Sequence, residues 1–214
     1  TVAVTSNVRL VEDAPEFPGE TEPVAFVRDF DRAVSLQRAG EMDQALQYYG
    51  KYLERRPGHS GSHNNMGVIY QAKQEYERAV KSYSDAIATE PDNHRTYNNL
   101  ASCYMAMNEP SRAVEALSRS LELAEDNLPA LINMGVAQTA LDDFRAAERY
   151  LSRALELYPD EPRIVYNLGN LFRWRGDTGR AAGYYERFLD GSSGKYASQE
   201  KQVRRYLKKV GESE

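Results

Sequence analysis

An asparagine recurs along the sequence at a fixed spacing of 34 residues. Its four copies are Asn65, Asn99, Asn133 and Asn167, and the corresponding position nearest the N-terminus is Asp31. A primary amide carries N–H donors and an acceptor oxygen, the set needed to hold the N–H and C=O groups of an extended peptide regardless of its side chains. We predict that these four residues, the asparagine row, bind a peptide backbone. The alternative is that they hydrogen-bond within the helix pair that carries them.

Polar and aromatic residues at neighbouring positions of the same segments would set specificity. These candidates are Asn64, Arg95, Asn98, Arg163, Tyr166, Asn170, Arg173 and Trp174. Tryptophan, tyrosine and arginine are the residue types that most often anchor protein interfaces, and a guanidinium can bind a carboxylate through two parallel hydrogen bonds. For Trp174 the alternative is that it packs beneath the C-terminal segment.

The residues that could support catalysis or metal binding form no convincing pattern. His59 and His63 are four positions apart, but His59 falls in a turn beside Pro57 and no acidic or cysteine ligand recurs nearby. Cys103 has no base at a helpful spacing, and the sequence holds no glycine-rich phosphate loop. We therefore expect no enzymatic activity, no metal and no cofactor.

The composition is that of an ordinary folded chain. Of the 214 residues, 41% are hydrophobic and 28% charged, and no run approaches the roughly 18 apolar residues of a membrane span. A net charge of -5 argues against nonspecific binding to nucleic acid. The single cysteine leaves the redox compartment open. No targeting segment is seen from Thr1 onward, so cytoplasmic and periplasmic locations both stay open.

Pairs of helices are expected to carry the asparagines. Small residues recur with the same period at two positions, and turn residues interrupt each period twice. The first set is Ala33, Gly67, Ala101, Gly135 and Gly169, and the second is Ala45, Ala79, Ala113, Ala147 and Ala181. Small residues on both helices allow close approach, and short connections make neighbouring helices antiparallel. The sequence thus predicts stacked helical hairpins.

The residues that define one unit resemble the tetratricopeptide repeat. They are Met66, Gly67, Tyr70, Ala79, Tyr83, Ala86 and Pro91. The resemblance implies an all-α, right-handed superhelical solenoid over residues 25–195, with five hairpins at 26–59, 60–93, 94–127, 128–161 and 162–195. It further implies that the first helix of each hairpin lines a concave groove in which the asparagine row grips a peptide.

The two ends of the chain differ in charge. Residues 1–24 are acidic and contain three prolines, which predicts an extended leader or linker, or alternatively a strand that enters a groove of this or another copy. After a Gly-Ser break at 191–194, residues 196–214 are basic and predict a capping helix. Its outer face holds Lys201, Arg204, Arg205, Lys208 and Lys209 and is expected to be solvated, or alternatively to contact an acidic partner, nucleic acid or lipid headgroups.

These features favour a protein-protein interaction adaptor or scaffold that holds a peptide in the groove. One alternative is a self-assembling scaffold, a homo-oligomer formed through the leader or the solenoid ends. Another is a regulatory domain of a larger membrane-tethered assembly. We expect no nucleic-acid partner and no membrane span.

Overall fold

The computed structural model describes residues 24–192 and 194–212, with side chains from Arg28 onward. The predicted leader lies outside the described residues, apart from Val24, which begins the first helix. All regular structure in the described part is α-helical, as predicted. Two compact units divide between Glu109 and Pro110, and this boundary splits the predicted third hairpin, 94–127.

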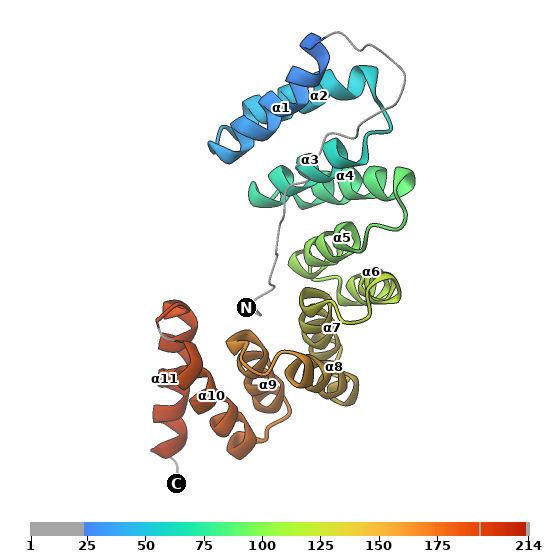
Figure 1. Ribbon diagram of the computed structural model, residues 1–214. Helices are drawn as coiled ribbons and strands as arrows, with labels where there is room; N and C mark the ends of the chain where they lie inside the picture. The colour runs from blue at the N-terminus through green and yellow to red at the C-terminus, as the bar shows by residue number, and fades with distance from the viewer. Residues whose placement is uncertain (1–23, 193, 213–214) are drawn as a thin grey trace. The chain divides into compact units, whose positions relative to one another are not determined.

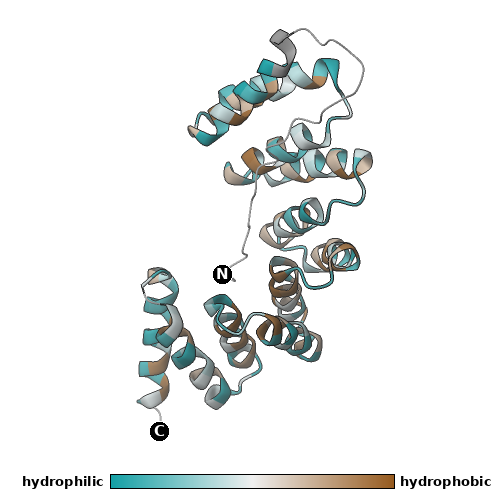
Figure 2. Cartoon of the chain, in the orientation of Figure 1, coloured by the Kyte–Doolittle hydropathy of each residue, from teal (hydrophilic) through white to brown (hydrophobic). Residues whose placement is uncertain are grey.

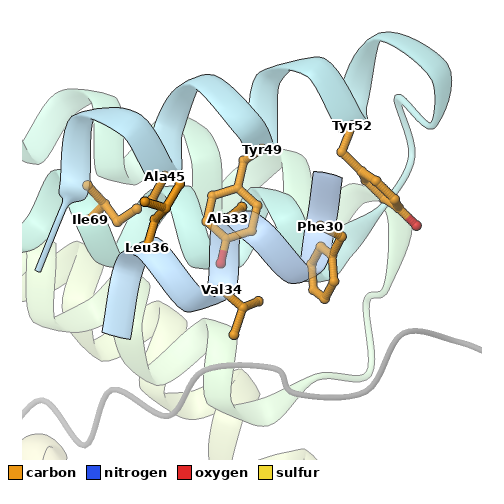
Figure 3. Close-up of a cluster of buried hydrophobic side chains, with 8 residues drawn as sticks. All are labelled: Phe30, Ala33, Val34, Leu36, Ala45, Tyr49, Tyr52 and Ile69. Carbon is orange, nitrogen blue, oxygen red and sulfur yellow. The ribbon is translucent and has the colours of Figure 1, made fainter. Parts of the chain in front are cut away.

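The first unit contains five helices, which are α1 (Val24–Arg38), α2 (Met42–Arg55), α3 (Ser60–Ala72), α4 (Tyr76–Thr89) and α5 (His94–Ala106). α1 pairs with α2 and α3 with α4, while α5 packs on α4 (Figure 1). Its core lies between α1 and α2, where Phe30 and Tyr49 meet edge to face at 5.8 Å between ring centroids (Figure 3). The aromatic residues are thus core material, as their period predicts.

The second unit contains six helices, which are α6 (Pro110–Leu123), α7 (Leu128–Ala140), α8 (Phe144–Leu157), α9 (Pro162–Trp174), α10 (Thr178–Ser192) and α11 (Ala197–Gly211). α7 pairs with α8 and α9 with α10, and α11 packs on α10 as the predicted cap. Every residue of α7 from Ala130 to Ala137 is buried, and this helix is largely brown in Figure 2. A helix that is apolar on all sides belongs inside the stack.

The break predicted at 191–194 begins later than expected. Gly191 and Ser192 form the last turn of α10. Ser192 is buried and its hydroxyl donates to Glu200 at 2.5 Å, while the backbone N–H of Gly194 donates to the same carboxylate at 2.9 Å. Gly194 has a φ of 77°, so the reversal falls at the one residue that adopts this conformation readily. A carboxylate from α11 therefore fixes the end of α10.

Helix starts and turns repeat with the sequence period. Side chains at 59, 93, 127 and 161 all accept a hydrogen bond from the backbone at the start of the next helix. The residues that follow the first helix of each hairpin have positive φ, namely Gly40, Gln74, Asn108, Asp142 and Gly176. A left-handed residue ends a helix by letting the N–H groups just beyond the helix donate to its last free carbonyls. Local chemistry thus defines each hairpin.

Of these four caps, His59 is the one whose ordinary pKa, about 6.5, lies near neutral pH. Its Nδ1 accepts from the backbone N–H of Ser62 at 3.0 Å, and its ring packs against Phe30 and Tyr52 at 5.0 and 4.9 Å between centroids. Burial, followed by the charges of His63 and Arg56, lowers the pKa of His59. The unfolded chain therefore takes up a proton at higher pH than the folded one, so stability falls as pH drops below the unfolded value of about 6.5.

Replacing His59 with asparagine should flatten this pH dependence. Asparagine is the cap at 93 and 127, so His59→Asn keeps an acceptor and removes the titrating group. Between pH 7.5 and pH 5.5 we expect the wild type to lose up to about 1 kcal/mol more of its free energy of unfolding than the variant, the value of a lost cap, because only the wild-type cap becomes protonated. Urea unfolding at both pH values measures this. An equal loss of stability on acidification in both proteins would contradict it.

Candidate functional site

The structure places the asparagine row inside the helical packing. Asn65, Asn99, Asn133 and Asn167 lie mid-way along α3, α5, α7 and α9, and none is more than 3% exposed. The neighbouring candidates Asn64 and Asn98 are each 4% exposed. These six amides offer almost no accessible surface to a peptide in this structure. Contact between them and a peptide stays a prediction that the structure does not test.

A chain of hydrogen bonds in the first unit shows what one member of the row does. The amide nitrogen of Asn65 donates to the Tyr49 hydroxyl at 3.0 Å, and this hydroxyl donates to Gln37 Oε1 at 2.7 Å. On the other side, Asn64 Nδ2 donates to Asn65 Oδ1 at 3.3 Å and Asn64 Oδ1 accepts from Thr96 at 3.4 Å. Burial raises the pKa of Tyr49, which keeps its phenol protonated. Asn65 thus bonds to α2 of the preceding hairpin, whereas the alternative offered by the sequence was a bond within its own helix pair.

Asn167, a member of the asparagine row in the second unit, forms different hydrogen bonds from Asn65. Asn167 Nδ2 donates to the backbone carbonyl of Arg163 at 2.8 Å, whereas its Oδ1 is buried with no hydrogen-bond partner among the described residues. Arg163 itself, a predicted peptide contact, holds Glu161 through Nε and Nη2 at 2.7 and 3.0 Å. This pairing lowers the pKa of Glu161 and fixes the N-terminus of α9. Arg163 is therefore already engaged by a carboxylate of its own chain.

The remaining candidates are accessible to different degrees. Arg95, Arg173 and Trp174 are exposed, Asn170 is partly buried and Tyr166 is buried. Trp174 is 66% exposed, so it does not pack beneath the capping helix, which was the alternative for this residue. An indole this exposed is uncommon unless it serves an interface.

A pocket of about 470 Å³ lies in the second unit between α9 and α11. This cationic pocket is lined by Tyr166, Asn170, Arg173, Trp174, Gln202, Arg205, Tyr206 and Lys209. The four α9 residues are predicted site residues, and the structure brings them together. The four α11 residues were not among the predicted site residues, although Arg205 and Lys209 belong to the basic face for which an acidic partner was the alternative. Their spacing of three, four and seven positions places them on one helix face.

Hydrogen bonds and ring contacts fix the walls of the cationic pocket. The Tyr166 hydroxyl donates to Gln202 Oε1 at 3.2 Å, which ties α9 to α11. The Tyr185 hydroxyl donates to Asn170 Oδ1 at 2.8 Å, and burial raises the pKa of Tyr185 to about 12. The Arg173 guanidinium lies 5.1 Å from the centroid of the Tyr206 ring. The lining is thus ordered without a ligand.

The pocket is positively charged. Arg173, Arg205 and Lys209 contribute three cations, and no acidic residue is among the lining residues. Within the described part of the chain, neither Arg173 nor Arg205 forms an ion pair with a carboxylate. Such a site attracts anions, and an exposed indole beside it suits a side chain of a partner.

Comparison with known families identifies the repeats. Four family models, each described as tetratricopeptide repeat, match residues 29–59, 60–93, 92–160 and 132–196. Together they run without a gap from residue 29 to residue 196. The chain belongs to the tetratricopeptide repeat family. The predicted resemblance is confirmed, and members of this family are typically noncatalytic scaffolds for protein interactions. A search of curated protein sequences gave no match.

Solved structures of tetratricopeptide repeat proteins share the fold. MamA from Desulfovibrio magneticus RS-1, residues 41 to the end, is 16% identical over 80% of this chain and 97% of its own, with a TM-score of 0.74. PilW, a type IV pilus biogenesis factor, is 19% identical over 86% and 91%, with a TM-score of 0.72. YrrB, described as having an unusual peptide-binding site, is 21% identical over 77% and 84%, with a TM-score of 0.67. These likenesses confirm the all-α solenoid class.

The described residues offer neither a membrane-spanning helix nor a cluster of potential metal ligands. Among them, no helix has the length and apolar character that crossing a bilayer would require. Nor do histidine, cysteine and acidic side chains gather in threes as potential metal ligands anywhere in this part of the chain. Cys103 is buried, and burial raises the pKa of its thiol to about 12, which makes it a poor nucleophile near neutral pH.

Proposed function

We propose that this tetratricopeptide repeat protein is an adaptor that binds a peptide segment of a partner protein in the cationic pocket. The observation that carries the proposal is the convergence of Tyr166, Arg173 and Trp174 with the α11 residues around one pocket. Its volume of about 470 Å³ falls in the range of roughly 300–1,000 Å³ found for specific ligand sites. The description of YrrB, with a peptide site on the same fold, supports the proposal.

The asparagine row is given a supporting role in this proposal. A peptide that contacted Asn65 would have to replace its bond to Tyr49, which links α3 to α2. Asn167 lies on α9, the helix that contributes four residues to the pocket, and its bond to the Arg163 carbonyl stays within that helix. We therefore assign the row to positioning the first helices and the pocket to contacting the partner.

Replacing Trp174 with alanine should weaken partner binding without unfolding the protein. An exposed indole contributes little to stability, so the free energy of unfolding should change by less than about 0.5 kcal/mol. Loss of an aromatic anchor should weaken binding by about 5- to 150-fold. The measurement is quantitative capture of partner proteins from cell extract on immobilised wild type and variant, followed by titration of the captured partner.

A matched control is Leu141→Ala. Leu141 is also an exposed apolar residue of the second unit, at 40% exposure, but it does not line the pocket. Capture by this variant should equal capture by the wild type. If Trp174→Ala retained the partner as well as Leu141→Ala does, the pocket would not be the binding site.

A further inference from the structure

We propose that the cationic pocket is selective for acidic peptides and that Arg173 and Arg205 together bind a peptide carboxylate. This inference rests on the proposed function, because it names the chemical class of peptide that the same pocket would take. It gives the capping helix a recognition role in addition to closing the stack. Neither the repeat pattern nor the asparagine row contributes to it.

The pocket arginines differ from several other arginines of the same unit. Several arginines outside the pocket pair with nearby carboxylates, namely Arg153 with Asp126, Arg163 with Glu161, Arg175 with Glu148 and Arg180 with Asp177. Arg173 and Arg205 have no such partner among the described residues, although they line one pocket from two helices. What sets these two guanidinium groups apart is that both line the same pocket, where neither is engaged by a carboxylate of the described chain and both can bind one from a ligand.

The two amides of the lining, Asn170 and Gln202, each already accept a hydrogen bond. Asn170 Oδ1 accepts from the Tyr185 hydroxyl, and Gln202 Oε1 accepts from the Tyr166 hydroxyl. What these two amides can still offer a ligand is mainly N–H donors. With the guanidinium groups, the lining therefore presents donors and positive charge. A ligand that matches it must be rich in acceptors and negative, and a carboxylate has two acceptor oxygens and no donor.

The ring of Tyr206 contacts one of the two pocket arginines. Its hydroxyl is buried and has no hydrogen-bond partner within the described residues, although Tyr206 lines the pocket. Its ring meets Tyr185 edge on at 5.2 Å and lies under Arg173 at 5.1 Å. The ring thus holds Arg173 in place before a ligand arrives, which reduces the entropy that the guanidinium loses on binding.

The test uses the full chain and short peptides of known charge. The probe is acetyl-Glu-Glu-Leu-Glu-Glu with a free C-terminus, compared with its C-terminal amide and with the amide of acetyl-Gln-Gln-Leu-Gln-Gln. Binding is read by calorimetry and by the fluorescence of Trp174, the only tryptophan in the sequence. We expect the neutral peptide to bind at least about 10-fold more weakly than the acidic probe. If the acidic peptide and its C-terminal amide bind with equal affinity, the carboxylate that the arginines bind is that of a glutamate side chain. If the amide binds more weakly, it is the C-terminal carboxylate.

Arg205→Gln and Arg204→Gln form a matched pair of variants. The two residues are adjacent on α11, both are exposed and both substitutions remove one positive charge, but only Arg205 lines the pocket. We expect Arg205→Gln, and likewise Arg173→Gln, to weaken binding of the acidic probe by about 5- to 50-fold. Arg204→Gln should change it by less than about 2-fold at physiological ionic strength, because charges outside the pocket are screened.

The outcomes separate this inference from the proposed function. Equal weakening by Arg204→Gln and Arg205→Gln would show diffuse attraction and overturn the carboxylate site, as would failure of the acidic probe to bind. Tight binding of the neutral peptide, or partner capture that still depends on Trp174 after both arginine substitutions, would overturn acid selectivity and leave the pocket as the peptide site. If the Trp174→Ala variant captures the partner as well as the wild type does, the proposed function itself is wrong.

Discussion

Replacing Gly67 with alanine is expected to lower the free energy of unfolding by about 1–3 kcal/mol. A Cβ at this position would lie 2.6 Å from Cε1 of the Tyr83 ring, closer than carbon atoms can approach. The ring has no room to yield, because Tyr83 is fully buried and its hydroxyl donates to Gln71 at 2.9 Å. The substitution therefore forces α3 away from α4 or the ring out of its place.

Gly50→Ala is the matched control for this prediction. Gly50 lies within α2, and nothing lies within 4 Å of a Cβ built there. Both substitutions gain the same helix propensity, so Gly50→Ala should raise stability by about 0.5–1 kcal/mol. The difference between the two variants in urea unfolding followed by circular dichroism isolates the clash. Shifts of the same sign and size in both would mean that the helices separate freely at Gly67.

Replacing Tyr49 with phenylalanine should lower the free energy of unfolding by about 1–3 kcal/mol. The hydroxyl is fully buried and links two polar side chains, Gln37 on α1 and Asn65 on α3. Removing it leaves the Gln37 acceptor and the Asn65 donor in the core without this partner, and an unpaired buried polar group is costly. The ring itself still fits, so the expected loss comes from hydrogen bonding and not from packing.

The same substitution at Tyr206 provides the contrast. Its hydroxyl is also buried but has no hydrogen-bond partner among the described residues, so Tyr206→Phe should leave stability unchanged within about 0.5 kcal/mol or raise it. Urea unfolding of the two variants side by side gives the comparison. A Tyr206→Phe variant that loses as much stability as Tyr49→Phe would show that the hydroxyl of Tyr206 is bonded in the folded protein.

Much of the fold could be predicted from the sequence because its causes are local. The caps at 59, 93, 127 and 161 and the left-handed residues at 40, 74, 108, 142 and 176 act within a few positions of themselves. Because the caps and turn residues recur every 34 residues, the length of each hairpin, the order of its helices and the family can be predicted from one repeat unit. The late end of α10 escaped the prediction because Glu200, eight positions beyond Ser192, holds it.

The candidate site depended on contacts between distant residues. Periodicity marked Asn65 but could not tell an exposed amide from one bonded to Tyr49, which is 16 positions away. The α9 residues Tyr166, Arg173 and Trp174 were found from the sequence, whereas the α11 residues opposite them were not. The hydrogen bond from Tyr166 to Gln202 joins residues 36 positions apart, so a local sequence pattern could not predict it.

The sequence by itself determined the repeat, the helices and the residue types available for binding, because each follows from backbone geometry and side-chain size over a few turns. Only the tertiary structure decided which polar groups are buried and which meet in a pocket. It also decided where glycine is required. The same register holds alanine at Ala33 and glycine at Gly67, where the Tyr83 ring excludes a Cβ, because the separation of two packed helices is set by all the side chains between them.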